Sequence, residues 1–88
     1  MVSKKATIID KEGFHMRAAD DFVNEMAKFK SSITISSTDK TANGKSIMRL
    51  MAAAYKRGTE VEIKCEGEDE EAQLAKACEM IASGFGET

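Results

Sequence analysis

The sequence contains little histidine and cysteine, the residues from which zinc centres and redox sites are built. Its 88 residues include one histidine, His15, and two cysteines, Cys65 and Cys78. The two cysteines fit no metal-binding or redox spacing, and a zinc site with a single histidine would need carboxylates to complete it. Both cysteines lie in apolar patterns, so we expect them to be small buried side chains.

Long apolar runs and a strong net charge are also missing. No segment approaches the length of a membrane span, and the basic residues 1–5 are not followed by the apolar region of a signal peptide. A net charge of −2 provides no basic footprint for nucleic acid. We therefore expect a cytoplasmic protein that neither inserts into a membrane nor binds nucleic acid.

What the chain does contain is typical of one globular domain spanning residues 1–88. Hydrophobic residues make up 42% of it and charged residues 32%, with no repeat, linker or low-complexity segment. This length leaves no room for a cofactor domain beside a substrate domain. No Ser-His-Asp, paired-carboxylate or phosphate-loop pattern is present, which disfavours a true enzyme.

Apolar periodicity predicts seven elements in the order β-α-β-β-α-β-α. The acidic run 66–71 does not fit the spacing of a calcium loop, so we interpret it as a solvated turn and helix start. Four short strands need a cover for one apolar face, and only the helices can supply it. The prediction is an α+β two-layer open-faced sandwich, with a mainly antiparallel four-stranded sheet and three helices. The strands are expected at 4–9, 32–37, 41–43 and 60–65. The helices are expected from 16 to about 29, from 47 to a stop at 58, and from the turn at 67–69 to an end at 84.

His15 falls between the turn expected at 10–13 and the first helical residues. An anion carried there would be stabilised by the unpaired N–H groups and the positive dipole end of the helix. Arg17 adds a guanidinium that can bind phosphate oxygens in a bidentate manner, and a neutral imidazole is a good nucleophile. A lone histidine at a helix start is, however, often only a capping or surface residue.

A resemblance strengthens the phosphate interpretation. Residues 13–19, Gly-Phe-His-Met-Arg-Ala-Ala, resemble the Gly-Leu-His-Ala-Arg-Pro-Ala signature of HPr, the histidine-containing phosphocarrier family of the bacterial sugar phosphotransferase system. Residues 44–48, Gly-Lys-Ser-Ile-Met, are similar to the second segment of that family. The similarity extends over essentially the whole chain, and the predicted order of elements is the one that this family adopts.

The resemblance implies a mechanism in which His15 and Arg17 are the catalytic residues. Enzyme I, a phosphoenolpyruvate-dependent protein kinase, would phosphorylate Nδ1 of His15. The phosphoryl group would then pass to a histidine or cysteine of an IIA-type acceptor. The chain needs no cofactor or metal of its own for either step, because both reside on the kinase. We expect it to act as a monomer.

Ser46 has two interpretations, which stay open. It is a suitable N-cap for the second helix, and this role needs no regulation. In Gram-positive members of the family the matching serine is phosphorylated by an ATP-dependent kinase, so a serine kinase and phosphorylase are further candidate partners. Arg49 stands where those members usually have glycine.

Four apolar side chains are expected to form a partner-binding surface on the two helix starts. Methionine suits a surface that meets several partners because its side chain repacks easily. The alternative is that most of these side chains belong to the core, but the second helix is apolar on more than one side. The four residues are Met16, Ile47, Met48 and Met51, with docking favoured most for Ile47 and Met48.

Several residues depart from the family pattern. Ala18 replaces the signature proline in a chain without any proline, and Met16 stands where alanine is usual. Asp20 and Asp21 place negative charge one turn along the helix. These departures suggest a divergent paralogue with its own partners. The alternative function is therefore a non-transferring regulatory or scaffold protein that acts by binding, with Ser46 as its control point.

Overall fold

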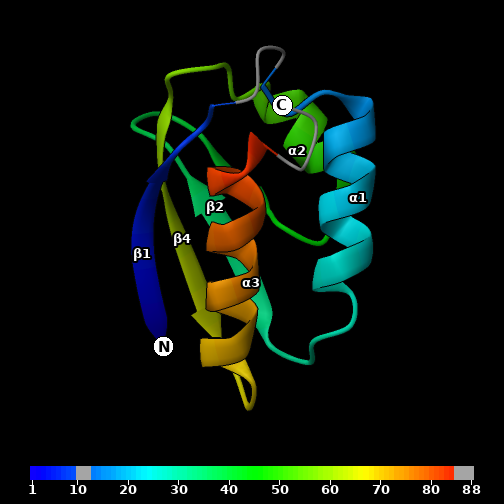
Figure 1. Cartoon of the computed structure of the whole chain (residues 1–88), viewed down its shortest axis with the longest axis vertical. Helices are drawn as coiled ribbons and strands as arrows, with labels where there is room; N and C mark the ends of the chain where they lie inside the picture. Colours follow the sequence, from blue (N-terminus) through cyan, green and yellow to red (C-terminus); the bar gives the residue numbers. More distant parts are fainter. Residues whose placement is uncertain (10–12, 85–88) are drawn as a thin grey trace.

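The computed structural model describes residues 1–9 and 13–84, which form one sheet and three helices packed on it (Figure 1). The predicted order and the α+β open-faced sandwich are confirmed. None of the helices in these residues is long and apolar enough to cross a membrane. The elements are β1 (Val2–Thr7), α1 (Met16–Met26), β2 (Ser32–Ser36), β3 (Thr41–Asn43), α2 (Ile47–Ala53), β4 (Glu60–Glu66) and α3 (Glu70–Ala82).

All neighbouring strands of the sheet are antiparallel, in the order β1-β4-β2-β3. β4 is enclosed between β1 and β2, and Ile63 lies opposite Lys4 on one side and Ile35 on the other. Residues of β4 alternate between buried and more exposed positions, because successive side chains of a strand point to opposite faces. One face of the sheet is therefore apolar and covered by the helices, and the other is polar.

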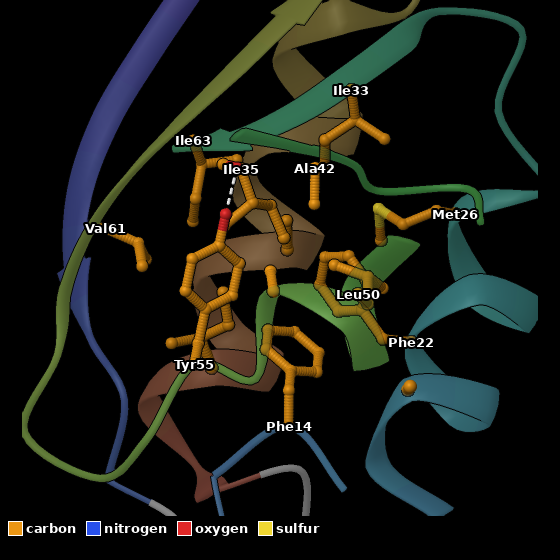
Figure 2. Close-up of a cluster of buried hydrophobic side chains, with 14 of the residues drawn as sticks. Phe14, Phe22, Met26, Ile33, Ile35, Ala42, Leu50, Tyr55, Val61 and Ile63 are labelled. Carbon is orange, nitrogen blue, oxygen red and sulfur yellow. Dashed lines mark hydrogen bonds between the residues drawn. The ribbon is translucent and has the colours of Figure 1, made fainter. Parts of the chain in front are cut away.

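The core lies between the sheet and the helices (Figure 2). Tyr55 follows α2 and reaches across this core, where its hydroxyl donates a 2.6 Å hydrogen bond to the carbonyl of Ile35. The polar tip of the ring is thus satisfied while the ring itself fills apolar space. The largest fully buried apolar side chains are Phe22, Ile8, Met26, Ile33, Ile35, Leu50, Ile63 and Ile81.

The ends of the elements differ from the prediction where distant contacts decide them. β1 covers 2–7 and not 4–9. Val2 pairs with Cys65 of β4, and regular pairing ends after Thr7, where the carbonyl of Ile8 accepts the N–H of Gly58. α2 ends before Ala54 and not near residue 58. Ala54 adopts a left-handed conformation with φ of +51°, which ends the helix.

The other helices are also shorter than predicted. α1 ends at Met26, three residues early, and the following turn is held by the Lys45 amine, which donates to the carbonyl of Phe29 at 2.7 Å. α3 begins at Glu70, directly after the turn expected at 67–69, and it ends at Ala82, where an end at 84 was expected. Of the turn predicted at 10–13, residues 10–12 lie outside the described residues.

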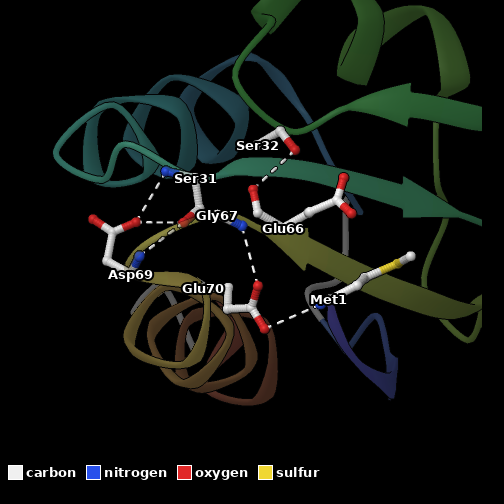
Figure 3. A network of polar contacts seen from close by, with 7 residues as sticks. All are labelled: Met1, Ser31, Ser32, Glu66, Gly67, Asp69 and Glu70. Carbon is white, nitrogen blue, oxygen red and sulfur yellow. Dashed lines mark hydrogen bonds and ion pairs between the residues drawn. The ribbon is translucent and has the colours of Figure 1, made fainter.

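A polar network joins the segment after α1 to the start of α3 (Figure 3). Asp69 is the N-cap residue of α3, but its carboxylate accepts hydrogen bonds from the N–H of Lys30 and from both the N–H and the hydroxyl of Ser31. These bonds, with that of the Ser31 hydroxyl foremost, lower the pKa of Asp69 to about 2. Glu70 accepts from the N–H of Gly67 at 3.1 Å.

The two cysteines differ in their surroundings, and both thiols are free. Cys65 is buried on the covered face of β4, as expected. Cys78 is only half-buried, and it lines a shallow groove between β1 and α3. The expectation that both side chains are buried is therefore wrong for Cys78, because its helical position faces the margin of the sheet.

Candidate functional site

The loop that leads to His15 is pressed against the end of α2. Gly13 has φ of +67°, and a Cβ atom at this position would lie 2.1 Å from the carbonyl oxygen of Tyr55. The N–H of Phe14 donates to the same oxygen at 2.9 Å. Only glycine combines this backbone conformation with such a close approach. The backbone just before His15 is thus fixed against the segment that follows α2.

Phe14 anchors the same loop in the core (Figure 2). Its ring lies edge-on to Phe22 of α1, with centroids 5.4 Å apart, and at 6.2 Å from the ring of Tyr55. Edge-to-face aromatic pairs of this kind are worth about 1 kcal/mol beyond their buried area. Because Phe14 is 4% exposed and directly precedes His15, core packing fixes the backbone next to the histidine.

His15 is the N-cap residue of α1, as the sequence predicted. Its backbone is extended, with φ of −82° and ψ of 177°, and its carbonyl accepts the N–H of Ala19 at 2.9 Å. The imidazole is half-buried and makes no capping hydrogen bond to α1, whose residues are all described. The side chain therefore projects from the end of a helix whose first N–H groups and dipole favour an anion.

The N-terminal turns of α1 and α2 line a shallow hollow beside His15. Arg17 is exposed and lines this hollow, so a guanidinium and an imidazole face the same space. We call this surface the His15 hollow. Its lining residues are His15, Met16, Arg17, Asp20, Ile47 and Met51.

The four expected partner-binding residues are distributed unequally around the His15 hollow. Met16 and Met51 line it with 66% and 38% of their surface exposed, which is far more than core residues show. Ile47 lines it as well but is half-buried and packs against the core. Met48 is 83% exposed and does not line the hollow. It lies one residue further along α2, on the surface beside it.

Ser46 is the N-cap residue of α2, as predicted. Its backbone is extended, and its hydroxyl accepts the N–H of Arg49 at 3.2 Å. The side chain is half-buried and stands directly before Ile47, which lines the His15 hollow. The candidate regulatory residue therefore lies at the border of the same surface.

Asp20 lines the His15 hollow, although the sequence indicated only that its negative charge lies near the site, one turn along the helix from His15. Its spacing from Met16, four residues, places both side chains on one face of α1 and was the available signal. Gly13 and Tyr55 were also not recognised as a pair, because their contact joins segments that are far apart in the chain.

The arrangement is suited to holding a small anion at the surface. A histidine nitrogen can act as a nucleophile, the guanidinium of Arg17 can bind two oxygens of a phosphoryl group, and the helix start favours negative charge. Within residues 1–9 and 13–84, no group of three or more His, Cys, Asp or Glu side chains could hold a metal ion. Together, the open-faced sandwich and the histidine at a helix cap define a class of small proteins that carry a histidine beside a surface hollow.

Comparison with known proteins identifies the class more closely. Residues 2–83 match the family model PTS-HPr, described as the PTS HPr component phosphorylation site. The chain is 37% identical to phosphocarrier protein HPr of Neisseria meningitidis (serogroup A) over 87 residues, covering 99% of this chain and 98% of that one. It is 40% identical to the HPr protein of Borreliella burgdorferi over 83 residues, covering 94% and 96%.

A solved structure shows the same fold throughout. The crystal structure of HPr-C-His from Thermoanaerobacter tengcongensis has a TM-score of 0.94 to this structure and 36% sequence identity, covering 100% of this chain and 99% of that one. The chain therefore belongs to the HPr family of phosphocarrier proteins of the phosphotransferase system.

Proposed function

We propose that this chain accepts a phosphoryl group on His15 from an enzyme I-type kinase, which uses phosphoenolpyruvate, and passes it to IIA-type acceptor proteins. The observation that carries the proposal is the position of His15 at the N-cap of α1, in a surface hollow that it shares with Arg17. A shallow site suits transfer between two proteins, because in-line displacement needs access from outside.

In each transfer the leaving side chain keeps the electron pair of the broken bond to phosphorus. Nδ1 of neutral His15 attacks the phosphorus atom held by the kinase, and a new N–P bond forms as the old bond breaks. Arg17 binds the phosphoryl oxygens, and the first turn of α1 favours the negative charge. In the second transfer the acceptor side chain attacks the phosphorus atom on His15, and His15 leaves with the electron pair of the broken N–P bond. Any metal and the phosphoenolpyruvate are held by the kinase.

The test is an incubation of the purified chain with phosphoenolpyruvate, Mg²⁺ and the enzyme I homologue of the same organism. We expect one phosphoryl group per chain that is stable in base and lost in acid, as is characteristic of phosphohistidine. His15→Ala should accept none, whereas Ser46→Ala should accept it normally. Absence of acid-labile phosphate on the wild-type chain, or its presence on His15→Ala, would contradict the proposal.

The second candidate is a regulatory protein that binds without transferring phosphate and is controlled at Ser46. It is favoured by the 83% exposure of Met48, directly beyond the helix start that Ser46 caps. A phosphate on Ser46 is tolerated by a helix N-terminus, so it would act on docking and leave the fold intact. The same incubation separates the two functions. The regulatory protein would bind its partner but leave His15 unphosphorylated.

The proposal also covers the setting in which the chain acts. We propose that residues 1–88 form one domain, which works as a monomer in the cytoplasm and is phosphorylated on Ser46 by a serine kinase where such regulation exists. The molecular mass in solution, measured by light scattering at the concentration of the transfer assay, tests the monomer. A dimer mass that persists on dilution would contradict it.

A further inference from the structure

The His15 hollow carries charges of both signs. Arg17 and Asp20 both line it, three residues apart on α1, while Met16, Ile47 and Met51 supply an apolar lining. One cation and one anion thus lie about 4.5 Å apart along the helix axis, from the rise of 1.5 Å per residue. A partner that reaches His15 has to cover both of them.

The carboxylate of Asp20 is exposed, and it forms no ion pair with any of the residues 1–9 and 13–84. Asp21, the next residue, is exposed as well. A partner seated on the hollow removes water from Asp20. A carboxylate that loses its water without gaining a cation opposes binding, whereas one that gains a cation favours it.

We propose that Asp20 selects the partner of this site. The face that docks on the His15 hollow has an apolar centre and a lysine or arginine that pairs with the Asp20 carboxylate. This inference rests on the proposed carrier function, and it deepens that function by describing the partner. The two charges also orient the partner. The phosphoryl group lies over Arg17, and the partner cation lies over Asp20, so only one rotation about the hollow satisfies both.

Binding can be measured apart from transfer. The wild-type chain and its Asp20→Asn variant are titrated by calorimetry into the enzyme I homologue of the same organism, without phosphoenolpyruvate, at low and high salt. We expect Asp20→Asn to bind roughly threefold to tenfold more weakly at low salt, with a smaller difference at high salt, where the ion pair is screened. Asp20→Lys should bind more weakly still, because it repels the partner cation.

The matched control is Glu68→Gln, which changes the net charge equally at an exposed acid in the turn before α3 and should leave the affinity unchanged. Thermal melting of each variant verifies that the fold is retained. Equal or tighter binding of Asp20→Asn, or an equal loss in Glu68→Gln, overturns the inference while phosphorylation of His15 continues. If the wild-type chain itself fails to bind, the carrier function fails together with the inference.

Discussion

At the scale of single residues, the position of His15 depends on a glycine that performs no chemistry. Gly13 has to adopt a positive φ, and it also has to let the backbone approach the carbonyl of Tyr55. Either requirement alone would favour glycine, and the two together leave no alternative. Since Phe14 is tied to the same carbonyl, displacement of this loop would move His15 relative to the start of α2.

Replacement of Gly13 by alanine, compared with the same replacement of Gly58, therefore separates the cost of the close contact from the cost of the positive φ. A positive φ costs a non-glycine residue about 1 kcal/mol, and the contact with the Tyr55 carbonyl adds to it, so we expect a loss of about 2 to 4 kcal/mol in the free energy of unfolding. Gly58→Ala is the control, because Gly58 has φ of +89° with nothing within 4 Å of its Cβ position. It should lose only about 1 kcal/mol in urea unfolding. Equal losses would show that the contact with Tyr55 has no energetic weight.

The sequence predicted some of these residues and not others for a physical reason. The cap positions of His15 and Ser46 were predictable, because a helix start is defined by residues next to it in the chain. The place of Asp20 in the His15 hollow was not, since the hollow exists only where α1 meets α2. The half-exposure of Cys78 likewise depends on how α3 lies over β1.

At the scale of elements, the order along the chain follows from local periodicity, but the ends are set by distant partners. β1 extends to Val2 because β4 offers Cys65 as its partner, and α2 stops at Ala53 because Tyr55 has to enter the core. The link between Ser31 and Asp69 is of the same kind. It joins the segment before β2 to the start of α3, 38 residues further on (Figure 3).

This link predicts an acid-sensitive contribution to stability. The pKa of Asp69 is lowered from 3.8 to about 2 in the folded chain, so the folded state favours the carboxylate. The contribution is complete above the ordinary pKa, and it is lost as the pH falls from about 4 towards about 2. Asp69→Asn should have a lower urea midpoint than the wild-type chain at neutral pH, with a gap that closes across this window.

Glu68→Gln serves as the control for Asp69. Its side chain is 80% exposed and lies 3.9 Å from the Lys30 amine, so removal of its charge should leave the urea midpoint nearly unchanged, by about 0.5 kcal/mol at most. If the difference in urea midpoint between Asp69→Asn and the wild-type chain stays constant down to pH 2, the stabilisation does not depend on the protonation of the Asp69 carboxyl.

At the scale of the whole molecule, β4 is one of the two interior strands of the sheet. It pairs with β1 on one side and β2 on the other, and α3 packs over it. Cys65 lies on its covered face with 1% of its surface exposed, whereas Cys78 borders the groove between β1 and α3. Exposure of Cys65 therefore requires the layers to separate, which amounts to unfolding of the whole sheet and helix assembly.

The two thiols should consequently report two different events. Burial raises the pKa of Cys65 to about 11 and also raises that of Cys78, so neither thiol is strongly reactive in the folded chain. With iodoacetamide at mildly alkaline pH, Cys78 should react by local motion. Cys65 should react through global unfolding, about a thousandfold or more slowly than in the unfolded chain. Peptide mass spectrometry measures both rates, and Cys78→Ser isolates Cys65. If low concentrations of urea do not change the rate at which Cys65 is modified, or if Cys65 reacts as fast as Cys78, then β4 becomes exposed without unfolding of the rest of the molecule.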